Sequence, residues 1–181
     1  MSTLTRATLD DLYREEGKAE LIGGRIVRLM SSGDLPSIVA FEIAVSLRTY
    51  AKTTGQGVAY ADGIGYAVPE LPSGRESFSP DASYYVGTRP VNRMRFVEGP
   101  PRFAAEVRSE NDYGDAAEAD LAAKRADYFA AGTAVVWDVD PLAETVAVYR
   151  ATAPVQPTVY RRRETAEAEP AVPGWSMPVD E

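Results

Sequence analysis

The chain has no cysteine and no histidine among its 181 residues. It therefore has no disulfide, no Ser-His-Asp triad, no Cys-His dyad and no zinc site with histidine or cysteine ligands. Its chemistry must come from carboxylates, lysine, arginine, tyrosine and hydroxyl side chains. Carboxylates and water are the ligands that Mg²⁺ and Mn²⁺ prefer, so these are the metals to expect.

Long apolar runs are also missing. No segment approaches the ~20 apolar residues that a membrane helix needs, and residues 1–14 mix polar and charged side chains, unlike a signal peptide. We therefore expect a cytoplasmic protein that does not bind membranes. Basic residues are in the minority and the net charge is −8, which argues against a nonspecific nucleic-acid coat. It does not exclude a nuclease, because part of the acidic excess would belong to a metal site.

The rest of the composition, with 45% hydrophobic and 25% charged residues, is typical of a soluble globular domain. We predict one domain over residues 1–181, with its core over roughly residues 8–150. Residues 151–181 are expected to add an edge strand and a peripheral tail.

The apolar pattern predicts an α/β order of elements. Apolar stripes of helical period predict helices over residues 8–16, 36–52 and 115–131. Alternating or continuous apolar side chains predict a hairpin over 19–29 and strands over 58–68, 82–86, 102–108, 134–139 and 145–149. The helices between strands favour a sheet covered by helices.

Two carboxylates fall on successive strands of this predicted sheet. Asp81 starts one strand, and Glu106 lies inside the next, which is otherwise largely apolar. Strand alternation turns Glu106 and Arg108 to the same face, and a carboxylate among apolar residues rarely goes unpaired. Lys124 lies on the apolar stripe of the following helix, so it should face the sheet and find a carboxylate. This is the layout of a metal-dependent nuclease core.

The segments around these residues resemble the Uma-two family, which belongs to the PD-(D/E)xK superfamily of restriction-endonuclease-like proteins. The resemblance rests on the order and spacing of several blocks. They are residues 79–86, Pro100-Pro101 before residues 105–107, residues 120–124, and Trp137 before residues 138–141. The resemblance implies an α/β core with a central mixed sheet flanked by helices, Mg²⁺- or Mn²⁺-dependent hydrolysis of phosphodiester bonds in DNA, and assembly as a homodimer.

The resemblance also implies a role for each acidic residue. Asp81 and Glu106 would bind the metal, and Lys124 would be the family lysine, moved to the helix. Glu20 would be an additional acidic group. A metal held by Asp81, Glu106 and the Val107 carbonyl would make an attacking water more acidic and neutralise phosphate charge. Lys124 would orient that water or stabilise the developing charge.

Two departures from the family pattern keep another interpretation open. Arg108 stands where the family lysine can follow the glutamate, and arginine can bind phosphate but is a poor proton acceptor. Many relatives carry a histidine near the start of the first long helix, and this chain has none. The alternative is a non-catalytic descendant of the nuclease fold that acts as an interaction or structural protein. Glu106 and Lys124 would then be a structural ion pair, and Glu20 a surface residue of the hairpin.

Overall fold

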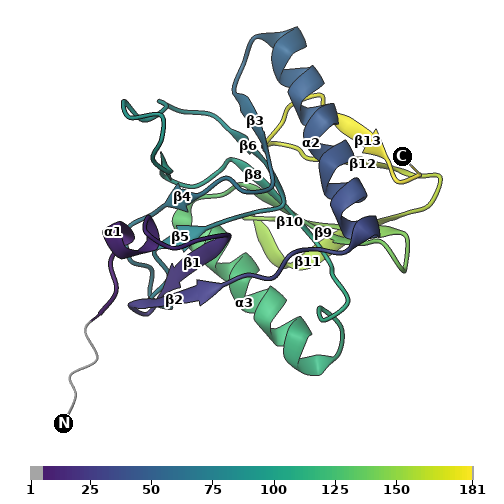
Figure 1. The fold of residues 1–181 in the computed structure, drawn as a ribbon. Coiled ribbons are helices and arrows are strands. Elements are labelled where there is room, and N and C mark those ends of the chain that lie inside the picture. The colour runs from purple at the N-terminus through teal and green to yellow at the C-terminus, as the bar shows by residue number, and fades with distance from the viewer. Residues whose placement is uncertain (1–5, 181) are drawn as a thin grey trace.

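The computed structural model describes residues 6–180. Residues 1–5, which belong to the segment compared with a signal peptide, and residue 181 lie outside the described part. A six-stranded sheet lies between two long helices (Figure 1). Its strands, in spatial order, are β11 (Ala153–Arg161), β10 (Thr145–Arg150), β9 (Val135–Asp140), β8 (Phe103–Val107), β6 (Ala82–Tyr85) and β3 (Val58–Ala61). Only the β8–β9 pair of this sheet is parallel. The predicted α/β architecture with a central mixed sheet is confirmed.

Helices α2 (Asp34–Thr54) and α3 (Asp115–Ala131) cover opposite faces of this sheet (Figure 1). Parallel strands need a long crossover, and α3 provides it between β8 and β9. α3 has the bounds predicted from its apolar stripe, and Gly132 ends it with a φ of 111° that favours glycine. No helix in residues 6–180 is long and apolar enough to cross a membrane.

Strand β8 turns alternate side chains to the two helices. Phe103, Ala105 and Val107 belong to the apolar core that also contains the inner face of α2. Ala104 packs in a second core with Tyr128 of α3, and Glu106 points the same way. The alternation predicted for this strand is therefore confirmed, and it places the only charged residue of β8 under α3.

The N-terminal part begins with a short helix, α1 (Leu9–Leu12), and a hairpin of β1 (Ala19–Ile22) and β2 (Arg25–Arg28). The hairpin is confirmed, and Gly23 and Gly24 in its turn have φ values of 58° and 68°. α1 is shorter than predicted. Thr8 caps its start with a hydroxyl that accepts the N–H of Asp11, and the chain leaves the helix after a single turn.

The predicted long strand over residues 58–68 is wrong, because the chain turns after β3. Gly63 has a φ of 93°, and its N–H donates to the Asp62 carboxylate at 2.7 Å. The following residues form β4 (Tyr66–Ala67), which pairs with β5 (Ser77–Phe78) and β7 (Val97–Glu98) in a small separate sheet. Asp62 thus lies in a turn.

The C-terminal residues are not a peripheral tail. β11 is an edge strand, as predicted, but the chain then returns through β12 (Thr165–Glu167) and β13 (Ser176–Pro178) to the α2 face of the sheet. Trp175 stacks on Trp137 with ring centroids 4.9 Å apart, and its indole N–H donates to Ser46 of α2. These C-terminal residues therefore form part of the apolar core on the α2 side of the sheet.

Candidate active site

Glu106 lies in β8 and Asp81 directly precedes β6, the neighbouring strand, so the two residues lie next to each other in the sheet, as predicted. Ala82 in β6 pairs with Ala105 in β8. The backbone N–H of Asp81 donates to the Ala105 carbonyl at 3.1 Å, and the N–H of Val107 donates to the Asp81 carboxylate at 2.8 Å. These bonds hold Asp81 beside Glu106. The role of the Val107 carbonyl as a metal ligand stays a prediction.

Lys124 reaches the site from α3. Its ammonium lies 2.8 Å from Glu106 Oε2 and 3.3 Å from Glu20 Oε1, and the three side chains are 17%, 15% and 3% exposed. We call these three residues the Lys124 cluster. The lysine predicted to face the sheet therefore does find a carboxylate. The alternative of a surface Glu20 is wrong, because β1 carries this side chain into the interior.

Further donors surround both carboxylates of the Lys124 cluster. The Tyr128 hydroxyl donates to Glu106 Oε1 at 2.6 Å. The Ser79 N–H donates to Glu20 at 2.9 Å, and the Arg75 guanidinium donates to Glu20 at 2.5 Å. Buried charges persist only when they are paired and hydrogen-bonded in this way. Sequence reasoning assigned no role to Arg75 or Tyr128, although Tyr128 lies on the same stripe of α3 as the lysine.

Burial and charge shift the pKa values of this cluster in different directions. Burial raises the pKa of Glu106 to about 6; Lys124 opposes this shift, and the charge of Asp81 adds to it. Burial alone would lower the pKa of Lys124, but the charges of Glu106 and Glu20 outweigh it and raise that pKa. Lys124 is therefore a permanent ammonium, suited to donating hydrogen bonds and stabilising negative charge.

A second lysine approaches Asp81 from the other side. The Lys18 ammonium lies 2.9 Å from Asp81 Oδ1 and 2.6 Å from Asp62 Oδ1, with the three side chains 20%, 14% and 48% exposed. We call these residues the Lys18 cluster. Sequence reasoning missed it, although Lys18 stands two residues before Glu20 and an extended chain turns both to one side.

Arg108 shares its sheet face with Glu106, as predicted, but its guanidinium is bound elsewhere. It donates to the Asp138 carboxylate at 2.8 Å and 2.9 Å and also bonds Glu118 of α3. Arg125 donates to the same Asp138 at 2.9 Å. Arg108 thus takes part in a neighbouring charge network, and phosphate contact by this residue stays a prediction.

Comparison with known proteins identifies the family and the fold. The family model "Uma2: Putative restriction endonuclease" matches residues 6–180. The chain belongs to this family. It is also similar to a crystal structure of "a putative nuclease belonging to DUF820 from Anabaena variabilis", with a TM-score of 0.74, 18% identity, and coverage of 96% of this chain and 95% of that chain. At this identity the match shows the fold alone. None of the curated proteins matches the chain.

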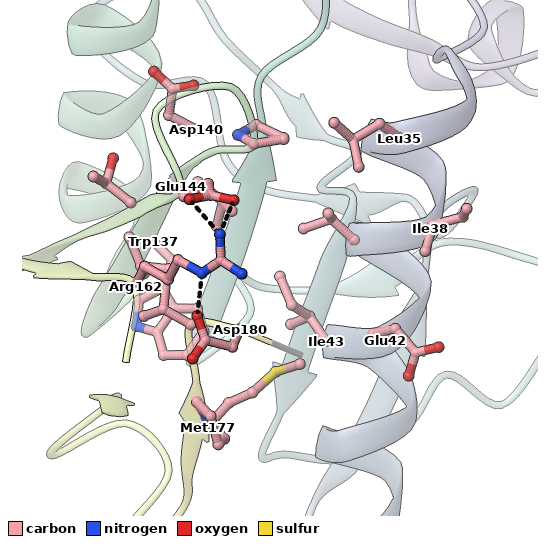
Figure 2. Close-up of a pocket in the computed structure, with 17 residues that line it drawn as sticks. Leu35, Ile38, Glu42, Ile43, Trp137, Asp140, Glu144, Arg162, Met177 and Asp180 are labelled. Atoms are coloured by element: carbon pink, nitrogen blue, oxygen red, sulfur yellow. Dashed lines mark hydrogen bonds and ion pairs between the residues drawn. The ribbon is translucent and has the colours of Figure 1, made fainter. Parts of the chain in front are cut away.

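A separate cavity of this Uma2-family fold lies on the opposite face of the sheet. Its volume is about 260 Å³, and it lies between α2, the β9–β10 hairpin and the C-terminal residues. Figure 2 shows Ile43 and Trp137 along the cavity, and Arg162 between Glu144 and Asp180 at its edge. None of its lining residues belongs to the Lys124 or Lys18 cluster, so the cavity is separate from the candidate site.

Proposed function

We propose that the protein is a metal-dependent endonuclease that hydrolyses phosphodiester bonds of DNA. One observation carries the proposal: Asp81, at the start of β6, and Glu106, in the paired strand β8, lie side by side with an α3 lysine 2.8 Å from Glu106. For a member of the family described as "Putative restriction endonuclease", this arrangement would supply the acidic ligands and the fixed cation that phosphodiester cleavage requires.

The donor set fits a magnesium or manganese ion. Mg²⁺ is usually bound through one or two carboxylates, with water and substrate phosphate completing its shell. Asp81 and Glu106 provide two such carboxylates, and the charge of Asp81 already raises the pKa of Glu106, a repulsion that a cation would relieve. In residues 6–180 no group of three or more His, Cys, Asp or Glu side chains is placed to hold a metal ion. Water and substrate phosphate would therefore have to complete the shell of an ion held by Asp81 and Glu106.

The chain's own groups have distinct tasks in this proposal. Asp81 and Glu106 would hold the ion, whose chemistry is to acidify a bound water and neutralise phosphate charge. Tyr128 and the Val107 N–H orient the two carboxylates by donating to the oxygens that face away from their lysines. Lys124 stays protonated and donates to the attacking water or to the phosphate oxygen that gains charge.

The first test is cleavage of supercoiled and linear DNA by the purified protein with Mg²⁺ or Mn²⁺. We expect nicking or cutting that EDTA abolishes and that Ca²⁺ does not support, because its looser shell positions water and phosphate less strictly. Asp81→Asn and Glu106→Gln should each lower cleavage by about 10²- to 10³-fold, the size expected for a lost charge-stabilising group. Glu42→Gln on the exposed surface of α2 is the matched control.

The non-catalytic alternative also has an observation in its favour. All the carboxylate oxygens of Asp81 and Glu106 already accept hydrogen bonds from Lys18, Val107, Lys124 and Tyr128. Isothermal titration with Mn²⁺ separates the two functions. A wild-type protein that binds no Mn²⁺ and cuts neither DNA nor RNA would favour an interaction or structural role. Assembly as a homodimer stays a prediction, which analytical ultracentrifugation tests.

A further inference from the structure

Lys18 is shared between a carboxylate inside the site and one outside it. Its ammonium bonds Asp81, a proposed metal ligand, and Asp62, which lies in the turn after β3. Asp81 offers its other oxygen to the Val107 N–H. The lysine therefore occupies the oxygen of Asp81 that is not engaged by the backbone.

We propose that Lys18 is the counter-ion of Asp81 in the metal-free protein and becomes a contact for the substrate phosphate when a divalent cation replaces it at Asp81. This inference rests on the proposed function. A divalent cation and an ammonium repel each other at the same carboxylate oxygen. Metal binding at Asp81 thus requires the ammonium to move aside.

Asp62, the second carboxylate partner of Lys18, lowers the free-energy cost of that movement. Asp62 is 48% exposed and already lies 2.6 Å from the ammonium, so Lys18 keeps an ionic partner after it leaves Asp81. Asp62 is itself fixed by the Gly63 N–H. Lys124 has no such exposed partner, because Glu106 and Glu20 are only 15% and 3% exposed. A metal would therefore approach Glu106 through Oε1, which Tyr128 rather than Lys124 contacts.

The position of Lys18 also suits an incoming phosphate. A phosphodiester anion that approaches Asp81, Glu106 and Asp62 meets negative charge and needs a cation on the open side of the site. Arg75 is only 8% exposed and bound to Glu20, and Arg108 is bound to Asp138. Among the cations near the two proposed ligands in residues 6–180, Lys18 has the most exposed side chain, 20% against 17% for Lys124 and 13% for Arg108.

The test compares Lys18→Met with wild type in two measurements that should move in opposite directions. Mn²⁺ affinity, measured by isothermal titration without DNA, should rise by about fivefold, the upper size of a partly exposed charge pair. Cleavage of a short DNA duplex should weaken by about fivefold in kcat/KM, mainly through a higher KM, because a phosphate contact is lost. Lys18→Arg restores the charge and should return both values towards wild type.

Lys52→Met is the matched control, since Lys52 is an exposed lysine in the last turn of α2. Thermal unfolding shows whether each variant is folded. If Lys18→Met binds Mn²⁺ more weakly and also cuts more weakly, Lys18 only maintains the site, and the inference is overturned. Unchanged affinity overturns the counter-ion role, and unchanged kcat/KM overturns the phosphate contact. A wild type that neither binds Mn²⁺ nor cuts DNA removes the proposed function and this inference together.

Discussion

The candidate site has two halves, the Lys124 cluster and the Lys18 cluster, each built from one lysine and two carboxylates. They differ in the solvent exposure of the second carboxylate. In the Lys124 cluster the second carboxylate, Glu20, is 3% exposed and bonded to Arg75 and Ser79. In the Lys18 cluster the second carboxylate, Asp62, is 48% exposed and lies in a turn. The second carboxylate is therefore buried in the Lys124 cluster and half exposed to water in the Lys18 cluster.

Under the proposed function, this difference makes Lys124 the fixed cation of the site and Lys18 the one that moves. Moving Lys124 would leave two carboxylates in a poorly solvated interior, where an unpaired charge is costly. Moving Lys18 from Asp81 leaves the ammonium on Asp62 and in contact with water. The Lys124 cluster therefore suits preorganised stabilisation of a transition state, whereas the Lys18 cluster suits the exchange of a metal cation and a phosphate.

The largest expected effect is that of Lys124→Ala. It removes the fixed ammonium, so cleavage should fall by about 10³-fold. The variant also leaves Glu106 and Glu20 without their shared cation, and its free energy of unfolding should fall by about 3 kcal/mol. Rates are compared at a temperature where circular dichroism shows both proteins folded. Lys52→Ala, an exposed lysine with the same change of charge, should cut like wild type.

A Lys124→Ala protein that is folded and retains cleavage within about threefold of wild type would contradict a catalytic task for the Lys124 cluster. The lysine would then be a structural partner of Glu106, and the comparison of the two halves would apply to stability alone.

The burial of Glu106 in the Lys124 cluster can be tested through the pH dependence of protein stability. Burial raises the pKa of Glu106 from 4.5 to about 6. Between these values the folded protein binds more protons than the unfolded chain, so this group lowers stability as the pH rises. Without metal, the difference in unfolding free energy between wild type and Glu106→Gln should change by about 1.5 kcal/mol between pH 4.5 and pH 6.5. Stability is measured by urea unfolding at each pH. If the difference between wild type and Glu106→Gln stays constant over this range, burial does not raise the pKa of Glu106.

A smaller effect is expected for Tyr128→Phe. The hydroxyl donates to Glu106 Oε1 at 2.6 Å in a fully buried position. Its loss leaves one carboxylate oxygen short of a donor, which should cost about 1–2 kcal/mol in unfolding free energy. Cleavage should fall by about 10-fold, because Glu106 loses one of the two bonds that orient it. Tyr113→Phe, which removes an exposed hydroxyl bonded to Asp140, is the matched control.

The two halves also differ in how far they could be predicted from sequence. Glu106 and Lys124 were predictable because each interrupts an apolar pattern of known period, a strand for one and a helix for the other. The structure brings them to 2.8 Å. The bounds of α3 followed from the same stripe, since a glycine stands directly after it.

The Lys18 cluster was missed because its residues lie just outside the strands, in bends or a turn. Lys18 precedes β1, and Asp62 lies where the expected strand over residues 58–68 breaks at Gly63. Such residues have no periodic signal, and their meeting depends on long-range packing of the hairpin on the sheet. The prediction of a peripheral C-terminal tail was wrong for a related reason. Small side chains such as Ala168 and Ala171 give a weak apolar pattern in the sequence, although both are fully buried in the structure.

The smallest expected effect is that of Asp62→Asn, and it sharpens the comparison most directly. Because Asp62 is half exposed, its ion pair with Lys18 should contribute no more than about 1 kcal/mol to unfolding free energy. In the variant the ammonium has only Asp81 as a carboxylate partner, so it competes more strongly for the metal. Mn²⁺ affinity should therefore fall by about threefold, opposite in sign to the change expected for Lys18→Met. A fall of about 100-fold would instead mean that Asp62 is itself a metal ligand, and the Lys18 cluster would then be part of the metal centre.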